Sequence, residues 1–266
     1  MHSRRVVIGG IAASLSVPLF SQTKQLPLRT TGIEHMGSVV PDVTAAAKFY
    51  GRVFNPEVHK EKDPPLRYYV TLNPGYLAFG SRANAPNAFF DHFCALVTDY
   101  DPAAMTEELK AEGMAGGRFG IIPDPDAIGL QLLKDPAGLA KSTERAGRIV
   151  EEAPLLKPRG LDAVMLHVTD VEKSAQFYRK FFGAPRVGHK SGELWFQVAG
   201  TQLALAKVAA GESPRVDYIR IRVEPFDSKD VTRELQKLGA KVEGVDANLT
   251  LRFTDPMGLG IEIMQG

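Results

Sequence analysis

The chain has 266 residues, with 32 Lys and Arg against 31 Asp and Glu and 44% hydrophobic residues. This length allows one or two globular domains with a sizeable core, and a near-neutral charge without a basic run argues against nucleic-acid binding. Because Cys94 is the only cysteine in the sequence, no internal disulfide can form.

The first residues have the pattern of an export signal. Ser3-Arg4-Arg5 precedes an apolar run from Val6 to Phe20 that is short for a membrane span. The paired arginines predict the twin-arginine route, although Gly9 stands where that signal has a lysine. We expect residues 1–31 to be a signal and a flexible lead-in, and the mature protein to be periplasmic or extracellular without a membrane span. The alternative is an uncleaved N-terminal anchor.

A strand followed by a capped helix is the clearest local pattern. Alternating residues predict a strand that begins near His35, and Asp42 can cap the first turn of the helix after it. That helix carries apolar residues at helical spacing and leads to Phe49-Tyr50. The helix is therefore expected to cover one face of a sheet.

This pattern occurs four times, which indicates an internal repeat. The copy from Leu161 through Asp170 to Phe177-Tyr178 keeps the first copy's spacing from Asp to Phe-Tyr, and looser copies contain His92 and Tyr218. The sequence thus predicts an α+β fold of four βαβββ units arranged as two similar halves.

A turn marker supports the same division. Asp135-Pro-Ala-Gly138 and Asp255-Pro-Met-Gly258 each predict a turn between two strands. The segment from Ala146 to Pro158 carries charges and two prolines without a strand pattern, so we expect a linker at residues 146–159. The N-terminal domain would span residues 32–145, and the C-terminal domain residues 160–266.

Together these motifs resemble the vicinal oxygen chelate superfamily, which includes glyoxalase I, the bleomycin-resistance proteins and the extradiol dioxygenases. The resemblance covers about residues 32–266. It implies curved mixed sheets, in which the first strand of each unit runs through the middle of a cup shared by two units.

Two histidines are candidate metal ligands. His35 and His92 each lie seven residues before the Asp of their unit, so the symmetry of paired units would bring them face to face. Two neutral imidazoles that converge in a cleft suit a divalent metal. The sequence does not distinguish Fe, Mn, Zn and Ni.

The resemblance also implies a glutamate ligand four residues after the glycine of Asp-Pro-x-Gly in an even-numbered unit. That position is Ser142 in the first half and Glu262 in the second. The second half has Ala163 and Tyr218 at its two histidine positions. If neighbouring units pair, His35 meets His92; if the first unit pairs with the fourth, His35 meets Glu262. We favour neighbouring pairs, because connections usually keep sequence neighbours adjacent.

Other candidate pocket residues are Cys94, Ser142 and Tyr218. Cys94 should share the face of His92, either as a buried core residue or as a soft ligand or reactive thiol. Glu34 and Asp91 flank the histidines, but alternation directs them to the opposite face.

The family resemblance implies two classes of function. One is a metal-dependent lyase, isomerase or ring-cleaving dioxygenase, with its site in the N-terminal half and a small substrate that carries vicinal oxygens. The other is a non-catalytic small-molecule-binding protein of the bleomycin-resistance type with a degenerate metal site. Either protein is expected to be a monomer or a homodimer.

Overall fold

The structure is a computed structural model, and it describes residues 26, 28–83, 85–98, 101–114, 120–188, 190–245 and 250–266. The predicted signal lies outside these ranges, so export stays a prediction. The described lead-in is shorter than expected, because the first strand begins at Arg29. Among the described residues, no helix is both long and apolar enough to span a bilayer.

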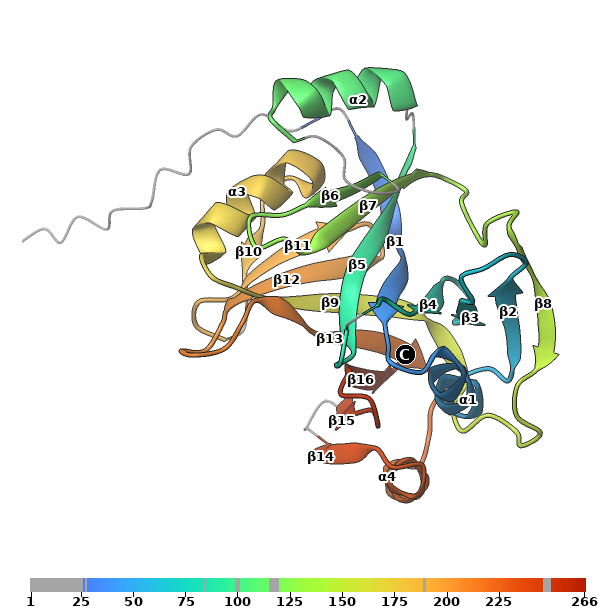
Figure 1. The fold of residues 1–266 in the computed structure, drawn as a ribbon. Coiled ribbons are helices and arrows are strands. Elements are labelled where there is room, and N and C mark those ends of the chain that lie inside the picture. Colours follow the sequence, from blue (N-terminus) through green and yellow to red (C-terminus); the bar gives the residue numbers. More distant parts are fainter. Residues whose placement is uncertain are drawn as a thin grey trace, which may run out of the picture.

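The fold is α+β and consists of two similar halves, as predicted (Figure 1). Sheet A has the strand order β6-β7-β5-β1-β4-β3-β2-β8, and sheet B has the order β10-β11-β12-β9-β13-β16-β15-β14. The strands of sheet A are β1 (Arg29–Val39), β2 (Glu57–Glu61), β3 (Tyr68–Thr71), β4 (Tyr76–Gly80), β5 (Phe89–Thr98), β6 (Ile121–Pro123), β7 (Gly129–Lys134) and β8 (Thr143–Arg148). Those of sheet B are β9 (Pro158–Val168), β10 (Arg186–Val187), β11 (Leu194–Val198), β12 (Thr201–Lys207), β13 (Arg215–Val223), β14 (Lys241–Val245), β15 (Thr250–Thr254) and β16 (Gly260–Gln265).

Each unit has one helix, and an aspartate caps each of the four. The helices are α1 (Val43–Val53), α2 (Pro102–Ala111), α3 (Val171–Phe182) and α4 (Ser228–Lys237). Asp42 accepts hydrogen bonds from the N–H groups of Thr44 and Ala45, both at 2.9 Å, which satisfies two of the free donors of the first turn. The predicted strand-to-helix transition is therefore confirmed.

Neighbouring units pair, as the adjacency rule predicts. The antiparallel strands β1 and β5 lie in the middle of sheet A, and β9 and β13 lie in the middle of sheet B. After β7, which corresponds to β16, the first half has an additional strand, because β8 pairs with β2 at the far edge of sheet A. This strand extends to Arg148, so the connection between the halves is residues 149–157 and is shorter than the predicted linker.

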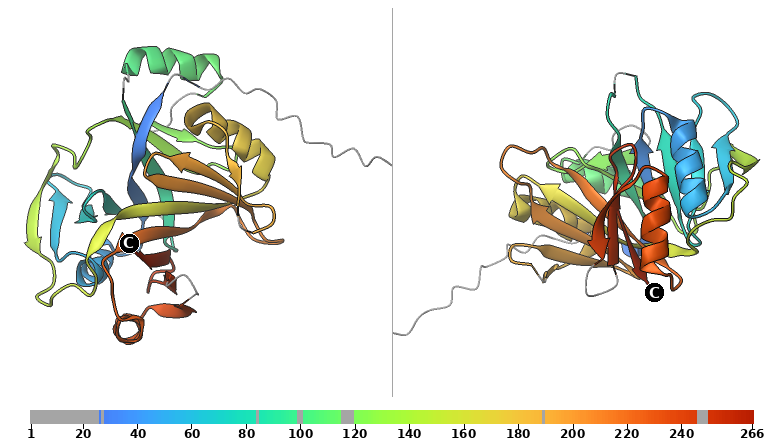
Figure 2. Two further views of the ribbon diagram at one scale, coloured as in Figure 1. Left: turned by 180° about the vertical axis from the view of Figure 1, so that it is seen from behind. Right: turned by 90° about the horizontal axis from the view of Figure 1, so that it is seen from below.

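The two halves share one continuous hydrophobic core, and buried hydrogen bonds cross between them, two of which join a tyrosine of one half to an aspartate of the other. The Tyr50 hydroxyl on α1 donates to Asp255 Oδ2 at 2.8 Å, and the Tyr178 hydroxyl on α3 donates to Asp124 Oδ2 at 2.9 Å. Helix α1 also lies beside α4 of the other half (Figure 2). The tyrosine of each Phe-Tyr motif thus binds an Asp-Pro turn of the opposite half.

These turns show which segments repeat. The side chains of Asp124 and Asp255 each accept a hydrogen bond at 2.8 Å from the N–H four residues later. The counterpart of Asp255-Pro-Met-Gly258 is therefore Asp124-Pro-Asp-Ala127, and the assignment of Asp135 to Gly138 was wrong. Ala127 has φ 65° where Gly258 has φ 104°, so an alanine occupies the left-handed position that usually selects glycine.

Removing the hydroxyl group of Tyr50 or of Tyr178 should weaken the contact between the halves. We expect Tyr50→Phe and Tyr178→Phe each to lower the free energy of unfolding by about 1 to 3 kcal/mol, because a buried carboxylate oxygen loses its donor. Chemical denaturation measures the change. Tyr68→Phe is the matched control, since no hydrogen bond of its hydroxyl is found among the described residues. Equal stability of all three variants would contradict the assigned role.

Candidate functional site

The face of sheet A that is turned away from the main core carries the candidate site. His35, Tyr76 and Cys94 are buried there but are not part of the main hydrophobic core. The imidazoles of His35 and His92 meet edge to face, with ring centroids 5.6 Å apart and an interplanar angle of 86°. The two histidines therefore lie next to each other, as the symmetry of paired units predicts, and their role as metal ligands stays a prediction. We call this group, with Glu34 and Gln131, the N-terminal site.

A glycine makes room for the second histidine. Gly37 on β1 pairs with His92 on β5, and the His92 ring lies directly over the Gly37 backbone. A Cβ at this position would overlap the imidazole. The two histidines can therefore approach each other closely because Gly37 has no side chain.

Two β-bulges bring carboxylates into the site, which corrects the expectation from strict alternation. The pairing of β1 with β5 skips Glu34 and Asp91, so each is the extra residue of a bulge. Glu34 Oε2 lies 3.1 Å from His35 Nδ1, and Asp91 Oδ2 lies 3.1 Å from His92 Nδ1. Each imidazole is thus oriented by the carboxylate of the preceding residue.

The position in sheet A that is equivalent to Glu262 is Gln131 and not Ser142. In sheet A, Gln131 on β7 pairs with Cys94, and in sheet B, Glu262 on β16 pairs with Arg220 in the equivalent register. The Gln131 side chain hydrogen-bonds to His35. Ser142 is exposed in the segment before β8, where its carbonyl accepts the Lys62 N–H at 2.9 Å. The error follows from the misassigned turn marker.

The electrostatics of the N-terminal site favour a cation. Burial lowers the pKa of His35, so its imidazole is neutral at pH 7. The Glu34 side chain is only 8% exposed, and its hydrogen-bond partners are this imidazole and the N–H of Gly138. Burial raises the pKa of the Cys94 thiol well above its usual value, so it stays protonated. Ligand atoms of Glu34, His35 and Cys94 all lie within 4.8 Å of one another.

Tyrosines line one side of the site. Tyr76 stacks on His35 with ring centroids 4.5 Å apart, and Tyr69 meets Tyr76 edge to face at 5.8 Å. The sequence assigns neither residue a role, because aromatic residues on strands are usually core. Phe79 does belong to the core, where it stacks on Tyr50 at 4.8 Å.

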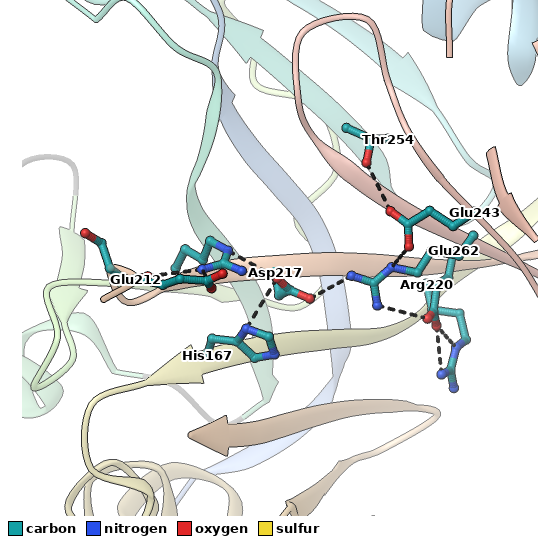
Figure 3. A network of polar contacts seen from close by, with 10 residues as sticks. His167, Glu212, Asp217, Arg220, Glu243, Thr254 and Glu262 are labelled. Atoms are coloured by element: carbon teal, nitrogen blue, oxygen red, sulfur yellow. Dashed lines mark hydrogen bonds and ion pairs between the residues drawn. The ribbon is translucent and has the colours of Figure 1, made fainter. Parts of the chain in front are cut away.

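The equivalent face of sheet B, the C-terminal site, contains a network of arginines and carboxylates (Figure 3). Arg220 takes the register position of Cys94, and its Nε and Nη2 atoms both lie 2.9 Å from Glu262 Oε2. Arg252 Nη1 is 3.7 Å from Glu262 Oε1. The carboxylate that the family resemblance assigns to a metal is therefore already paired with guanidinium groups.

Aromatic side chains complete the C-terminal site. Met165, Ala204 and Tyr218 form a small buried cluster, and the Arg220 guanidinium lies over the Trp195 and Tyr218 rings at 5.9 and 6.0 Å. Trp195 is half-buried on this face.

Comparison with known proteins places the chain in a family. The family model of the Glyoxalase/Bleomycin resistance protein/Dioxygenase superfamily matches residues 32–140 and 160–263. The chain belongs to this superfamily. No curated protein sequence matches it.

Solved structures with the same fold include a glyoxalase, dioxygenases and a synthase variant. A Mn(II)-bound glyoxalase from Novosphingobium aromaticivorans is 15% identical, with a TM-score of 0.61 over 90% of this chain and 83% of that chain. Homoprotocatechuate 2,3-dioxygenase from Arthrobacter globiformis is 18% identical, with a TM-score of 0.64 over 93% and 84%. A variant of 4-hydroxymandelate synthase from Streptomyces coelicolor is 14% identical, with a TM-score of 0.62 over 89% and 92%. At these identities the likeness establishes the fold alone.

Proposed function

We propose that the N-terminal site is the divalent metal centre of a metal-dependent lyase or dioxygenase. The observation that carries this proposal is the pair of adjacent imidazoles, each with its Nδ1 held by a bulge carboxylate. A carboxylate on one ring nitrogen is the usual partner of a metal-bound histidine, and it leaves Nε2 of His35 and His92 as the donor atoms. Gln131 would supply an oxygen.

Charge supports the assignment of the metal to the N-terminal half. Glu34 is buried beside a neutral histidine, and a buried carboxylate without a full positive partner is costly. A divalent cation would neutralise it. In the C-terminal site Arg220 already neutralises Glu262, so a cation bound there would gain less electrostatic stabilisation.

A bound metal would act as a Lewis acid on two neighbouring oxygens of a small substrate. The protein's own residues would prepare the site for this chemistry. Glu34 and Asp91 would hold the imidazoles in one tautomer, and Tyr76 would exclude water on the side where it stacks on His35. Iron, manganese, zinc and nickel are all compatible with nitrogen and oxygen donors.

Metal analysis of the purified protein tests this proposal. We expect about one equivalent of divalent metal in the wild-type protein and a loss of at least about tenfold in content for either His35→Ala or His92→Ala, because each variant replaces one of the two nitrogen donors with water and weakens the site. His167→Ala is the control, since His167 lies in the C-terminal site next to Asp217. Full metal content in both N-terminal variants would refute the proposal.

One observation favours the second class of function, a binding protein without turnover. The family's carboxylate position carries the neutral Gln131, which neutralises a dication less than glutamate does. 4-Nitrocatechol, a chelating diol, separates the classes. An enzyme of the proposed type should bind it only with metal present and with His35 intact. Equal binding by the metal-free protein would favour the binding-protein class.

A further inference from the structure

We propose that Glu34 is a positioning residue that couples His35 to a chain segment lying across the N-terminal site. We call residues 135–142 the crossing segment. The two oxygens of Glu34 have different partners: Oε2 faces His35 Nδ1 at 3.1 Å, and Oε1 accepts the N–H of Gly138. One buried carboxylate therefore contacts both a candidate ligand and the crossing segment. The metal-affinity part of this inference rests on the proposed function.

The topology explains why the segment crosses the site. It leaves β7, which pairs with β5, and enters β8, which lies beyond β2 at the opposite edge of sheet A (Figure 1). Between these ends the chain must pass β1, where Glu34 holds it. Its second anchor is Lys62, whose N–H donates to the carbonyl of Ser142 at 2.9 Å and whose Nζ donates to the carbonyl of Lys141 at 2.8 Å.

The crossing segment would limit access to the first histidine, which is the less exposed of the two. The His35 side chain is 6% exposed, whereas that of His92 is 17% exposed. The hydrogen bond from the Gly138 N–H to Glu34 anchors the crossing segment beside this histidine. Glu34 would thus set both the orientation of His35 and the opening of the site.

Two substitutions separate these two roles. Glu34→Ala removes both contacts. Glu34→Gln keeps one oxygen that can accept the Gly138 N–H, but its amide NH₂ would face His35 Nδ1 as a donor and reverse the tautomer of the imidazole. Glu144→Ala is the matched control, because Glu144 is an exposed acid on β8 that pairs with Lys60 at the edge of the same sheet.

The test uses the metal-free full chain and measures hydrogen exchange at the Gly138 amide and tryptic cleavage after Lys141. We expect Glu34→Ala to accelerate both by about tenfold, the factor that corresponds to one lost hydrogen bond to a charged acceptor, and Glu144→Ala to change neither. Glu34→Gln should keep the protection of Gly138 while the ¹⁵N shifts of His35 change to those of the other tautomer. Wild-type protection and cleavage in Glu34→Ala, or an unchanged His35 tautomer in Glu34→Gln, would overturn the inference.

Manganese titration then measures the effect on metal binding. We expect both Glu34 variants to bind manganese about 10- to 100-fold more weakly than the wild type, as is typical when the partner of a ligating histidine is lost. Unchanged affinity would exclude Glu34 as a positioning residue for the metal. If the wild-type protein itself binds no metal, the proposed function fails, while exchange, cleavage and the tautomer still decide the role of Glu34.

Discussion

Replacing Arg220 with alanine is expected to lower the free energy of unfolding by about 2 to 4 kcal/mol, because it leaves a buried carboxylate without its main partner. The Glu262 side chain is 10% exposed, and both of its contacts with Arg220 are 2.9 Å long. Arg252, at 3.7 Å, would neutralise it only in part. The variant also loses the packing of the guanidinium over Trp195.

Chemical denaturation of three variants tests this expectation. Arg233→Ala removes an exposed arginine of α4 that pairs with Asp230, and it should cost less than about 1 kcal/mol. Arg220→Met combined with Glu262→Met should recover most of the lost stability, because no uncompensated charge is left buried. If Arg220→Ala costs no more than Arg233→Ala, the guanidinium does not neutralise Glu262 in the way we describe.

Gly37→Ala is expected to reduce metal binding by at least about 100-fold, although Gly37 has no side chain that could bind a metal. Its new Cβ would overlap the His92 ring and force the imidazole away from His35, and a site that loses one of two nitrogen donors cannot hold the ion tightly. Circular dichroism would show whether the fold persists, and metal titration would measure the loss.

Gly200→Ala provides the control for this substitution. Gly200 lies in the turn between β11 and β12, where an added Cβ meets no atom within 4 Å. This variant should keep wild-type metal affinity. Wild-type affinity in Gly37→Ala as well would mean that the position of the His92 ring does not matter for binding, which would argue against His92 as a ligand.

The repeat and the pairing of units could be predicted because they depend on local patterns. Asp42 and Asp170 cap helices that contain the same Phe-Tyr pair at the same distance from the cap, and this spacing is visible in the sequence. Adjacent units then pair through their first strands, as short connections favour. The approach of His35 to His92 follows from these two facts.

The carboxylates of the site could not be predicted, because a bulge is a property of two paired strands. Glu34 and Asp91 occupy bulges in sheet A, and the pairing of β9 with β13 skips Asp162 and Asp217 in the same way. Strict alternation assumes an unbroken register, so it directs each of these acids to the wrong face. In all four units an acid directly precedes the position of the candidate ligand. This regularity is the signal that could have revealed the bulge carboxylates.

The third ligand position was missed because one turn departs from its usual composition. Ala127 adopts a left-handed conformation without being glycine, so the turn from Asp124 to Ala127 lacks the glycine that marks the turn from Asp255 to Gly258. A later segment, Asp135 to Gly138, carries the marker by composition but forms the first half of the crossing segment. The hydrogen bonds of Asp124 and Asp255 show that the segment from Asp124 to Ala127, and not the segment from Asp135 to Gly138, is the counterpart of the Asp255 turn.

Anomalous diffraction from crystals grown with manganese tests the central claim most directly. We predict one strong peak per chain, located between His35 and His92, and none at Glu262, where Arg220 forms the ion pair. A peak at Glu262, or no peak beside the two histidines at a saturating metal concentration, would contradict the assignment of the N-terminal site as the metal centre.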